Sequence, residues 1–531
     1  MARLSRTFAL VAVGATLAAT DLLAQAPALG DIDFPTSAMN AQAISQFERG
    51  VLLLHSFEYE DAANAFRAAQ ELEPGFVMAY WGEALTYNHP IWMEQDRDAA
   101  VAALARLADT PDARLAMAPT NRERGYLRAV ETLYGTIGQA QGADKHQRDF
   151  LYRDAMRRLH QAFPDDREAT AFYALSILGT AHEGRDFATY MRAAALVEPV
   201  FEANKSHPGA AHYLIHSYDD PIHAPLGLPM ARAYSKIAPA AAHAQHMTSH
   251  IFVATGMWDD VVVANEVARD VQNARQARLD RRPVVCGHYT YWLEYGYLQQ
   301  GRFDDAKQVM DTCYERIQSD PNQSELGYFA SMRARYVMDT GEWAAADAWV
   351  ADFGTKPNWN YEVVSAGRAL VQGDTATAQA IHAKMLAALD GVDSPSQLHV
   401  LERELAGVMM ISGGEVKNGL AALKDAARLE AEMPFEFGPP FIVKPTQELL
   451  GDFYTVLDMP AEAASAFKEQ LAHTPGRTNA LLGLARASSA LGDDVTAMET
   501  FSDLAKIWHS ADAGIPGLDE VRRASATDGS N

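Results

Sequence analysis

The stretch LGDFYTVLDMPAEAASAFKEQLAHTP, residues 450–475, decides the fold of this chain. Its apolar residues have the spacing of two short amphipathic helices joined by a turn. The key positions are Leu450, Gly451, Tyr454, Ala463, Phe467 and Pro475. Moving 34 residues along the chain gives similar residues again, namely Leu484, Ala485, Ala497 and Phe501. The sequence therefore predicts helical hairpins that repeat every 34 residues.

This pattern closely resembles the tetratricopeptide repeat (TPR) family. The same template fits near the start of the chain, at Gly50, Ala62, Phe66, Ala69 and Pro74. Between the two ends the match is weaker, and Gly-x-aromatic triplets at 256–258, 301–303 and 341–343 indicate further hairpin joints. The resemblance implies an all-α fold: an α-solenoid of TPR-like helical hairpins, forming a right-handed superhelix with a concave groove.

The N-terminus predicts export. A basic start, Met-Ala-Arg-Leu-Ser-Arg, precedes an apolar run over 7–19 that is too short to span a membrane. We expect a signal peptide over 1–26, a periplasmic or secreted protein and no membrane span. An oxidising compartment would permit a disulfide between Cys286 and Cys313, which fall on antiparallel partner helices in the repeat register. Whether they are bridged is left open.

The domain organisation follows from the repeats. We expect a linker over 27–39, N-terminal repeats over 40–205, histidine-rich central repeats over 206–318, C-terminal repeats over 319–512 and a tail over 513–531. The segment FEFGPPF, residues 435–441, interrupts the C-terminal repeats. We expect it to be a loop folded onto its neighbour; the alternative is a lid over the groove.

Several function classes are disfavoured. The net charge of −24, from 45 basic and 69 acidic residues, argues against nucleic acid as a partner. Two cysteines cannot form a thiolate zinc site. The chain has no Gly-rich phosphate loop, no H-E-x-x-H and no G-x-S-x-G motif, so nucleotide binding, zincin proteolysis and α/β-hydrolase chemistry have no motif behind them.

Histidines are the chemically distinctive feature. Of the 17 present, many lie in HPGAAHYLIHSYDDPIHAPLG (207–227) and HAQHMTSHIF (243–252). His212 and His216 are one helical turn apart, as are His246 and His250. The step from His212 to His246 is 34 residues, and so is the step from His216 to His250. The two pairs therefore occupy equivalent positions in successive repeats.

The TPR register implies that these histidines face the concave groove and converge there. The candidate metal ligands are His212, His216, His243, His246, His250 and His288. Imidazole suits a transition metal such as Zn, Cu or Fe, and neighbouring helices are close enough for such side chains to meet at one ion. Asp219 and Asp220 could complete the coordination or hold a ring N–H, and Tyr213 is a further catalytic candidate.

Three functions compete at this stage. The first is a TPR-like protein that binds one or two transition-metal ions, as a metal-dependent hydrolase or oxidase with a small-molecule substrate. The second is a non-enzymatic scaffold that binds a peptide or a cell-envelope protein in its groove, the commonest role of such repeats. The third is metal storage or delivery, which needs the same ligands. Spacing alone favours the first.

Overall fold

The chain is almost entirely helical, as predicted. The computed structural model describes residues 28–391 and 396–526. Apart from one antiparallel ribbon, β1 (Asn88–His89) with β2 (Glu94–Gln95), the regular elements in these ranges are helices. None of the helices in the described ranges is both long and apolar enough to cross a membrane. The predicted signal peptide over 1–26 lies outside the described residues.

The N-terminal part holds nine α-helices and one 3₁₀ turn. They are α1 (Ala41–His55), α2 (Tyr59–Leu72), α3 (Val77–Leu85), α4 (Arg97–Ala105), α5 (Pro111–Met117), α6 (Asn121–Leu133), η1 (Gly138–Ala140), α7 (Lys145–Ala162), α8 (Arg167–Leu178) and α9 (Phe187–Ala203). Side-chain N-caps such as Asn40 and Asp166 start them, because their oxygens accept hydrogen bonds from the free N–H groups of the first turn.

The central part continues the same architecture. It consists of α10 (Pro208–Tyr218), α11 (Ala224–Ile237), α12 (Ala242–Ala254), α13 (Trp258–Arg278), α14 (His288–Gln299) and α15 (Phe303–Ile317). The C-terminal part follows with α16 (Gln323–Thr340), η2 (Trp343–Asp347), α17 (Trp359–Val371), α18 (Thr375–Leu389), α19 (Gln397–Ser412), α20 (Val416–Glu432), α21 (Thr446–Val456), α22 (Pro460–His473), α23 (Thr478–Leu491), α24 (Asp494–Ile507), η3 (Trp508–Ser510) and α25 (Leu518–Ala526).

One packing contact defines the repeat at both ends of the chain. Phe467 of α22 fills the space left by Gly451 of α21 and Gly483 of α23, where an added Cβ would lie 2.6 and 2.3 Å from its ring. Phe66 of α2 packs on Gly50 of α1 and Gly82 of α3 in the same way. A bulky ring between two glycines lets three helices approach closely. The predicted solenoid of TPR-like hairpins is thus confirmed.

Two of the three predicted Gly-x-aromatic joints connect paired helices. Gly256 and Gly301 both have φ +70°, a left-handed conformation that glycine adopts without strain. The third differs, because Gly341 ends α16 but leads into η2 and an irregular segment rather than a paired helix. The irregular segment after η2 is held against α15 by Trp349, which is buried and whose ring N–H donates to Asp311.

The predicted linker and tail are both packed. Residues 28–39 are extended, but Leu29 and Phe34 are buried, and the ring of Phe34 lies 5.2 Å from that of Phe47. In the predicted tail, α25 buries Leu518 and Val521 in a small apolar cluster. Short apolar patches in a polar context carry little periodic signal, so the packing of these two segments could not be predicted from the sequence.

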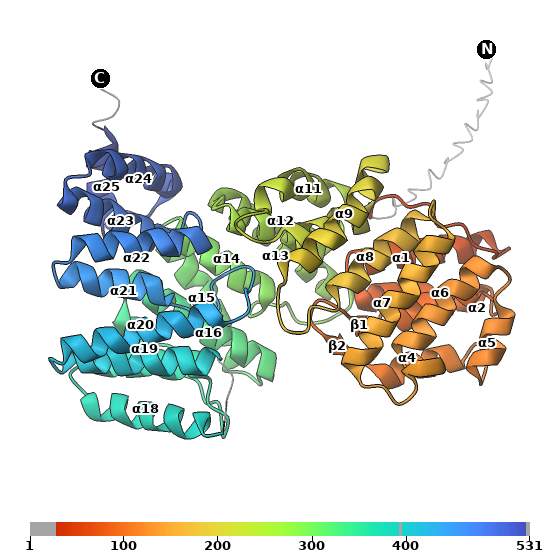
Figure 1. The fold of residues 1–531 in the computed structure, drawn as a ribbon, viewed down its shortest axis with the longest axis horizontal. Helices are drawn as coiled ribbons and strands as arrows, with labels where there is room; N and C mark the ends of the chain where they lie inside the picture. Colours follow the sequence, from red (N-terminus) through yellow and green to blue (C-terminus); the bar gives the residue numbers. More distant parts are fainter. Residues whose placement is uncertain (1–27, 392–395, 527–531) are drawn as a thin grey trace, which may run out of the picture.

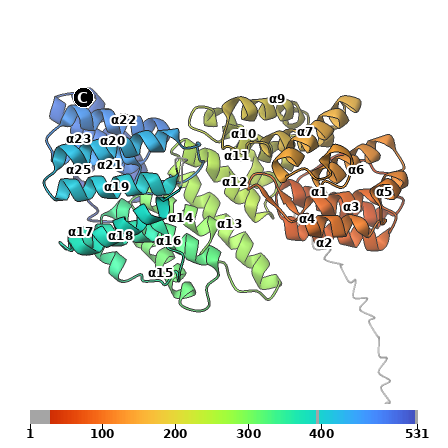
Figure 2. The same cartoon turned by 60° about the horizontal axis from the view of Figure 1, so that its bottom comes forward.

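The central helices lie in the middle of the molecule (Figures 1 and 2). The C-terminal repeats return to them: the Trp258 ring N–H donates to the carbonyl of Gly476 (2.8 Å) and that of Trp508 to the carbonyl of Gln299 (3.1 Å). On the other side, Arg275 of α13 pairs with Asp61 of α2. The helices that carry the histidines are therefore enclosed by chain from both ends.

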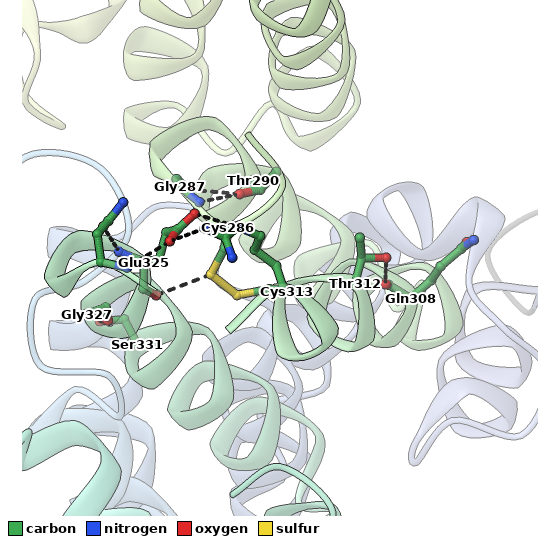
Figure 3. The surroundings of a disulfide bond; sticks show 11 residues. Cys286, Gly287, Thr290, Gln308, Thr312, Cys313, Glu325, Gly327 and Ser331 are labelled. Carbon is green, nitrogen blue, oxygen red and sulfur yellow. Dashed lines mark hydrogen bonds and ion pairs between the residues drawn. A yellow bond between two sulfur atoms is a disulfide. The ribbon is translucent and has the colours of Figure 1, made fainter. Parts of the chain in front are cut away.

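Cys286 and Cys313 form a disulfide (Figure 3), which answers the question that the sequence left open. Cys286 lies just before α14 and Cys313 lies in α15. The bond ties the start of α14, where His288 stands, to the next helix.

Candidate metal centre

Six histidines from three helices form two adjacent groups. The first histidine group is His212 and His216 of α10 with His243 of α12; the second histidine group is His246 and His250 of α12 with His288 of α14. In each group one ring nitrogen per residue lies within 4.8 Å of the others. The structure thus brings together all six of the candidate ligands.

The contacts within each group are made by Nε2 atoms. In the first, Nε2 of His243 lies 3.2 Å from Nε2 of His212. In the second, Nε2 of His246 lies 3.1 Å from that of His250 and 2.9 Å from that of His288. Between the groups, the His216 and His250 ring centres are 5.9 Å apart. Two centres, not one, therefore lie side by side.

The second histidine group is the first one moved along by one repeat. Each consists of an i, i+4 pair from one helix and a single histidine from the first helix of the next hairpin. His212 corresponds to His246 and His216 to His250, 34 residues on. His243 corresponds to His288, 45 residues on, because the long helix α13 and the segment after it intervene. The joints at Gly256 and Gly301 are also 45 residues apart, so the sequence had already placed His288 in register with this position.

Five of these histidines are buried and His288 is half-buried, contrary to the expectation of an open groove from the TPR register. Among the five, the exposed fraction is 0% for His212 and His246 and reaches only 7% for His243. Burial disfavours the charged imidazolium. It lowers the pKa of His212 and His288 to about 3, and those of His216, His243 and His246 well below their usual range. These five rings, whose pKa is lowered, are therefore neutral.

Hydrogen bonds at the far ring nitrogens fix three of the rings. Nδ1 of His212 donates to the carbonyl of His55 (2.6 Å), that of His246 to Oδ1 of Asn265 (2.7 Å) and that of His250 to Oδ2 of Asp219 (2.6 Å). Asn265 is oriented by its amide nitrogen, which donates to a main-chain carbonyl. A neutral ring with its hydrogen on Nδ1 has a bare lone pair on Nε2.

His216 differs from these three histidines in its Nε2 atom. Its Nε2 is buried and has no hydrogen-bond partner within the described residues. Buried polar atoms without a protein partner are uncommon in native proteins, and water, an ion or a ligand can satisfy them.

The three catalytic candidates take different positions. Asp219 holds His250 from behind, one of the two roles anticipated for it. Asp220 faces away: it pairs with Arg185 and His223 and accepts main-chain N–H bonds at the start of α11. Tyr213 is buried next to the first histidine group, and its hydroxyl lies 2.8 Å from Nδ1 of His55.

Aromatic rings that the sequence did not single out enclose the two groups. The ring of Phe57 lies 4.3 Å from that of His212 and 5.5 Å from that of His243. Trp292 lies 4.4 Å from the ring of His250. Such a shell keeps water out and lowers the local dielectric.

The backbone of Phe57 is in a strained conformation. It has φ +53° in the joint between α1 and α2, the position that Gly256 and Gly301 occupy in their joints. A bulky residue with positive φ is strained by roughly 1–3 kcal/mol, and such strain clusters at functional sites. The signal was present in the sequence as a joint without glycine, although nothing there indicated why.

The segment over 434–441, here called the lid segment, covers both groups. The Phe437 ring lies 5.2 Å from that of His250 and 6.3 Å from that of His216. Gly438, at φ +88°, lies so close to Trp292 that an added Cβ would be 2.2 Å from its ring. Arg335 donates to the carbonyl of Pro440 at 2.7 Å. These contacts agree with the preferred expectation of a loop folded onto its neighbour, and the alternative of a lid over the groove stays a prediction.

A third cluster, His55 with Glu168 and His207, lies behind the first histidine group. Nε2 of His55 is 2.7 Å from Oε2 of Glu168, and Nε2 of His207 is 3.1 Å from Oε1. Nδ1 of His207 caps α10 by accepting the N–H of Ala210, so the ring hydrogen lies on Nε2. A ring in that state cannot bind a metal through Nε2. The cluster therefore pairs two histidines with one buried carboxylate, a grouping that the sequence did not indicate.

No family model and no curated protein matches the chain. Among solved structures, yeast Tom70 aligns over 92% of this chain and 95% of its own, with 11% identity and a TM-score of 0.28. Human IFIT1 with m7Gppp-AAAA aligns over 93% and 92%, with 11% identity and a TM-score of 0.35. The TPR domain of P58(IPK) aligns over 85% and 99%, with 13% identity and a TM-score of 0.22. Likenesses this weak say nothing about function.

Proposed function

We propose that the two histidine groups hold two neighbouring transition-metal ions and that the protein is an oxidoreductase. The observation that carries this proposal is the placement of the ring hydrogens. His246 and His250 both use Nδ1–H to donate to oxygen, so their Nε2 atoms, 3.1 Å apart, both present lone pairs. Two lone pairs cannot form a hydrogen bond with each other. A cation between them resolves the conflict.

A proton could in principle be that cation, but the surroundings disfavour it. Burial lowers the pKa of His246 well below its usual range, and neighbouring histidines lower it further. A metal ion is favoured instead, because metal-bound histidines typically donate the other ring N–H to a carboxylate, amide or carbonyl oxygen. The partners here, Asp219, Asn265 and the His55 carbonyl, are of those three kinds.

The donor set favours copper. All six candidate ligands are imidazoles, and both cysteines are used in the disulfide. Imidazole suits Zn, Cu and Fe, and among divalent ions Cu²⁺ binds nitrogen donors most tightly. Three protein ligands per ion leave a coordination position free for water, dioxygen or a substrate.

The surroundings favour redox chemistry over hydrolysis. A metal hydrolase needs a base or a carboxylate close to its attacking water. Here Asp219 is committed to His250, and the neighbours of the two groups include the apolar rings of Phe57, Trp292 and Phe437. A dry, apolar pocket around redox-capable ions suits oxidation of a small organic substrate and limits competing reactions with water.

A scaffold role for this face is less well supported. A peptide that binds along a TPR groove needs exposed side chains to contact, whereas five of the six histidines are buried, and Phe437 of the lid segment packs on two of them. Other surfaces of the solenoid remain open to a protein partner. We also propose export to the periplasm or beyond, on the basis of the N-terminal sequence. The disulfide is consistent with an oxidising compartment. Mass spectrometry of the mature N-terminus tests whether the predicted signal peptide is removed.

Metal content tests the proposal. Untagged full-length protein, loaded with copper, zinc or iron and freed of excess, should hold two ions per chain. His216→Ala and His250→Ala should each lose one ion and keep the other. His382→Gln, which alters a histidine paired with Glu402 and remote in sequence from both groups, should keep two. Less than one ion in the wild type, or no loss in either variant, contradicts the metal centre.

The redox part of the proposal has its own readout. Copper-loaded protein should be bleached by a mild reductant and recover its absorption in air. A loaded protein that binds two ions but never cycles between oxidation states would leave the metal centre standing and overturn the oxidoreductase assignment.

A further inference from the structure

A buried chain of three side chains runs away from the first histidine group. Tyr213, next in sequence to His212, places its hydroxyl 2.8 Å from Nδ1 of His55. Nε2 of His55 lies 2.7 Å from Oε2 of Glu168. All three residues have an exposed fraction of 0%. His55 also accepts the ring N–H of His212 through its main-chain carbonyl, so the chain begins at a metal ligand.

The Glu168 carboxylate can only accept hydrogen bonds, and this fixes the direction of both bonds in the chain from Tyr213 through His55. Glu168 accepts from Nε2–H of His55 and faces Nε2–H of His207. With its hydrogen on Nε2, His55 presents a bare Nδ1 to Tyr213, which must then donate its O–H. A phenol that donates to a base backed by a carboxylate can release its proton without water. That is the arrangement a tyrosine needs to lose an electron at an accessible potential.

A neighbouring tyrosine shows what is special about Tyr213. Tyr234 is also buried, and its ring stacks on His212 at 5.3 Å, compared with 5.6 Å for Tyr213. Its hydroxyl, however, donates to the hydroxyl of Ser56, which is not a base. Two tyrosines at similar distance from one ligand thus differ in the proton acceptor alone.

We propose that Tyr213 is a redox-active tyrosine that supplies one electron to the metal pair. This inference rests on the proposed function, since the pair in its oxidised state is the natural one-electron oxidant. On oxidation the O–H bond of Tyr213 breaks. The electron goes to the oxidant and the proton goes to Nδ1 of His55, whose imidazolium keeps its Nε2–H bond to the Glu168 carboxylate. A neutral tyrosyl radical remains, and the return of one electron and that proton restores the phenol.

The role is distinct from substrate binding. Tyr213 is enclosed by the ring of Phe57 at 6.3 Å and by His55, and no part of it is exposed. An electron can cross such a contact where a substrate molecule cannot. The tyrosine would therefore store or relay one oxidising equivalent during turnover.

The experiment uses an external oxidant. Full-length protein, both metal-free and copper-loaded, is flashed with a ruthenium tris-bipyridine sensitiser and a sacrificial electron acceptor, frozen, and examined by electron paramagnetic resonance. Wild type and Tyr234→Phe should give a tyrosyl signal, and Tyr213→Phe should lose it. His55→Gln keeps the main-chain carbonyl but removes the base, so the radical yield should fall several-fold.

Contrary outcomes are equally clear. An unchanged signal in Tyr213→Phe, or an unchanged yield in His55→Gln, overturns the proposal. If a variant fails to fold, the wild type still decides: its radical should show a coupling to one exchangeable proton, the one held by His55, and absence of that coupling overturns the proposal. Because the oxidant is external, the two proposals fail separately. A Tyr213 radical in a protein that binds no metal after loading would overturn the proposed function alone, whereas two bound ions without a Tyr213 radical would overturn this inference alone.

Discussion

At the residue scale, Asn265 shows how the fold prepares a ligand. It lies on α13, outside both groups, and fixes the hydrogen of His246 on Nδ1. The sequence offered no sign of this role, because Asn265 is 19 residues from its partner and belongs to no motif. By contrast, the histidines themselves could be identified from spacing, since equivalent positions in a repeat face the same way.

Asn265→Ala should weaken metal binding at the second histidine group by about 10–100-fold, because loss of such a partner frees the ring to rotate and to change tautomer. Titration against a chromophoric chelator measures the affinity. Asn273→Ala, on the same helix but bonded to the main chain of Val284, should leave the affinity unchanged. Equal losses in the two variants would show that α13 matters only as a whole.

Glu294 offers a test of burial that does not involve metal. Both of its carboxylate oxygens are buried without a hydrogen-bond partner among the described residues, and burial raises its pKa well above 4.5. The folded state therefore keeps a proton that the unfolded state releases above about pH 4.5. As the pH rises above about 4.5, towards the raised pKa of the folded state, the free energy of unfolding should fall by roughly 1.4 kcal/mol per pH unit.

Glu294→Gln removes that linkage. The variant should match the wild type near pH 4 and be more stable than it at pH 7, as measured by urea unfolding. Glu448→Gln should instead be less stable than the wild type at pH 7. The substitution removes a carboxylate that pairs with Arg477, and this pairing lowers the pKa of Glu448 to about 2. A Glu294→Gln variant that is less stable at every pH would show that the carboxylate makes favourable contacts after all.

At the element scale, the lid segment packs on one histidine of each group, through Phe437. Phe437→Ala should let a chelator remove metal roughly tenfold faster, because the ring that spans His216 and His250 is gone. Stopped-flow absorption measures the rate. Phe441→Ala, in the same segment but 49% exposed, should leave it unchanged. If both variants release metal at the wild-type rate, the segment is packing and not a lid.

The disulfide acts on a single element, α14. Because it closes a separation of 27 residues, replacing both cysteines by serine should cost about 3 kcal/mol of unfolding free energy. Cys286 lies two residues before His288, so the second histidine group should lose affinity while the first keeps it. Calorimetric titration separates the two sites. Equal weakening of both would place the effect in global stability and not in α14.

Elements were predicted unevenly. The hairpins over 450–507 and 41–72 could be identified because small and bulky residues occupy fixed positions, and their contacts, such as Phe467 on Gly451, are local. The lid segment could not be placed, because it contacts histidines nearly 200 residues away and carries no periodic signal. Phe57 was missed for a different reason: its joint lacks the glycine found in other joints, but that absence does not show which site the ring contacts.

At the scale of the whole molecule, the solenoid works as an enclosure. N-terminal, central and C-terminal repeats meet around α10, α12 and α14, through contacts such as His55 on His212 and Phe437 on His250. An open groove, as the sequence implied, would leave the histidines wet and protonatable. The closed arrangement gathers them in two groups, and the repeat supplies the duplication: a three-histidine site that is present in one hairpin step recurs in the next.

The most direct test is to locate the ions. A crystal of metal-loaded, untagged protein, measured at the absorption edge of the metal, should show two anomalous peaks. One should lie between the Nε2 atoms of His212, His216 and His243 and the other between those of His246, His250 and His288, each about 2.0–2.1 Å from its nitrogens. A single shared peak, or peaks elsewhere with both groups empty, would contradict the account.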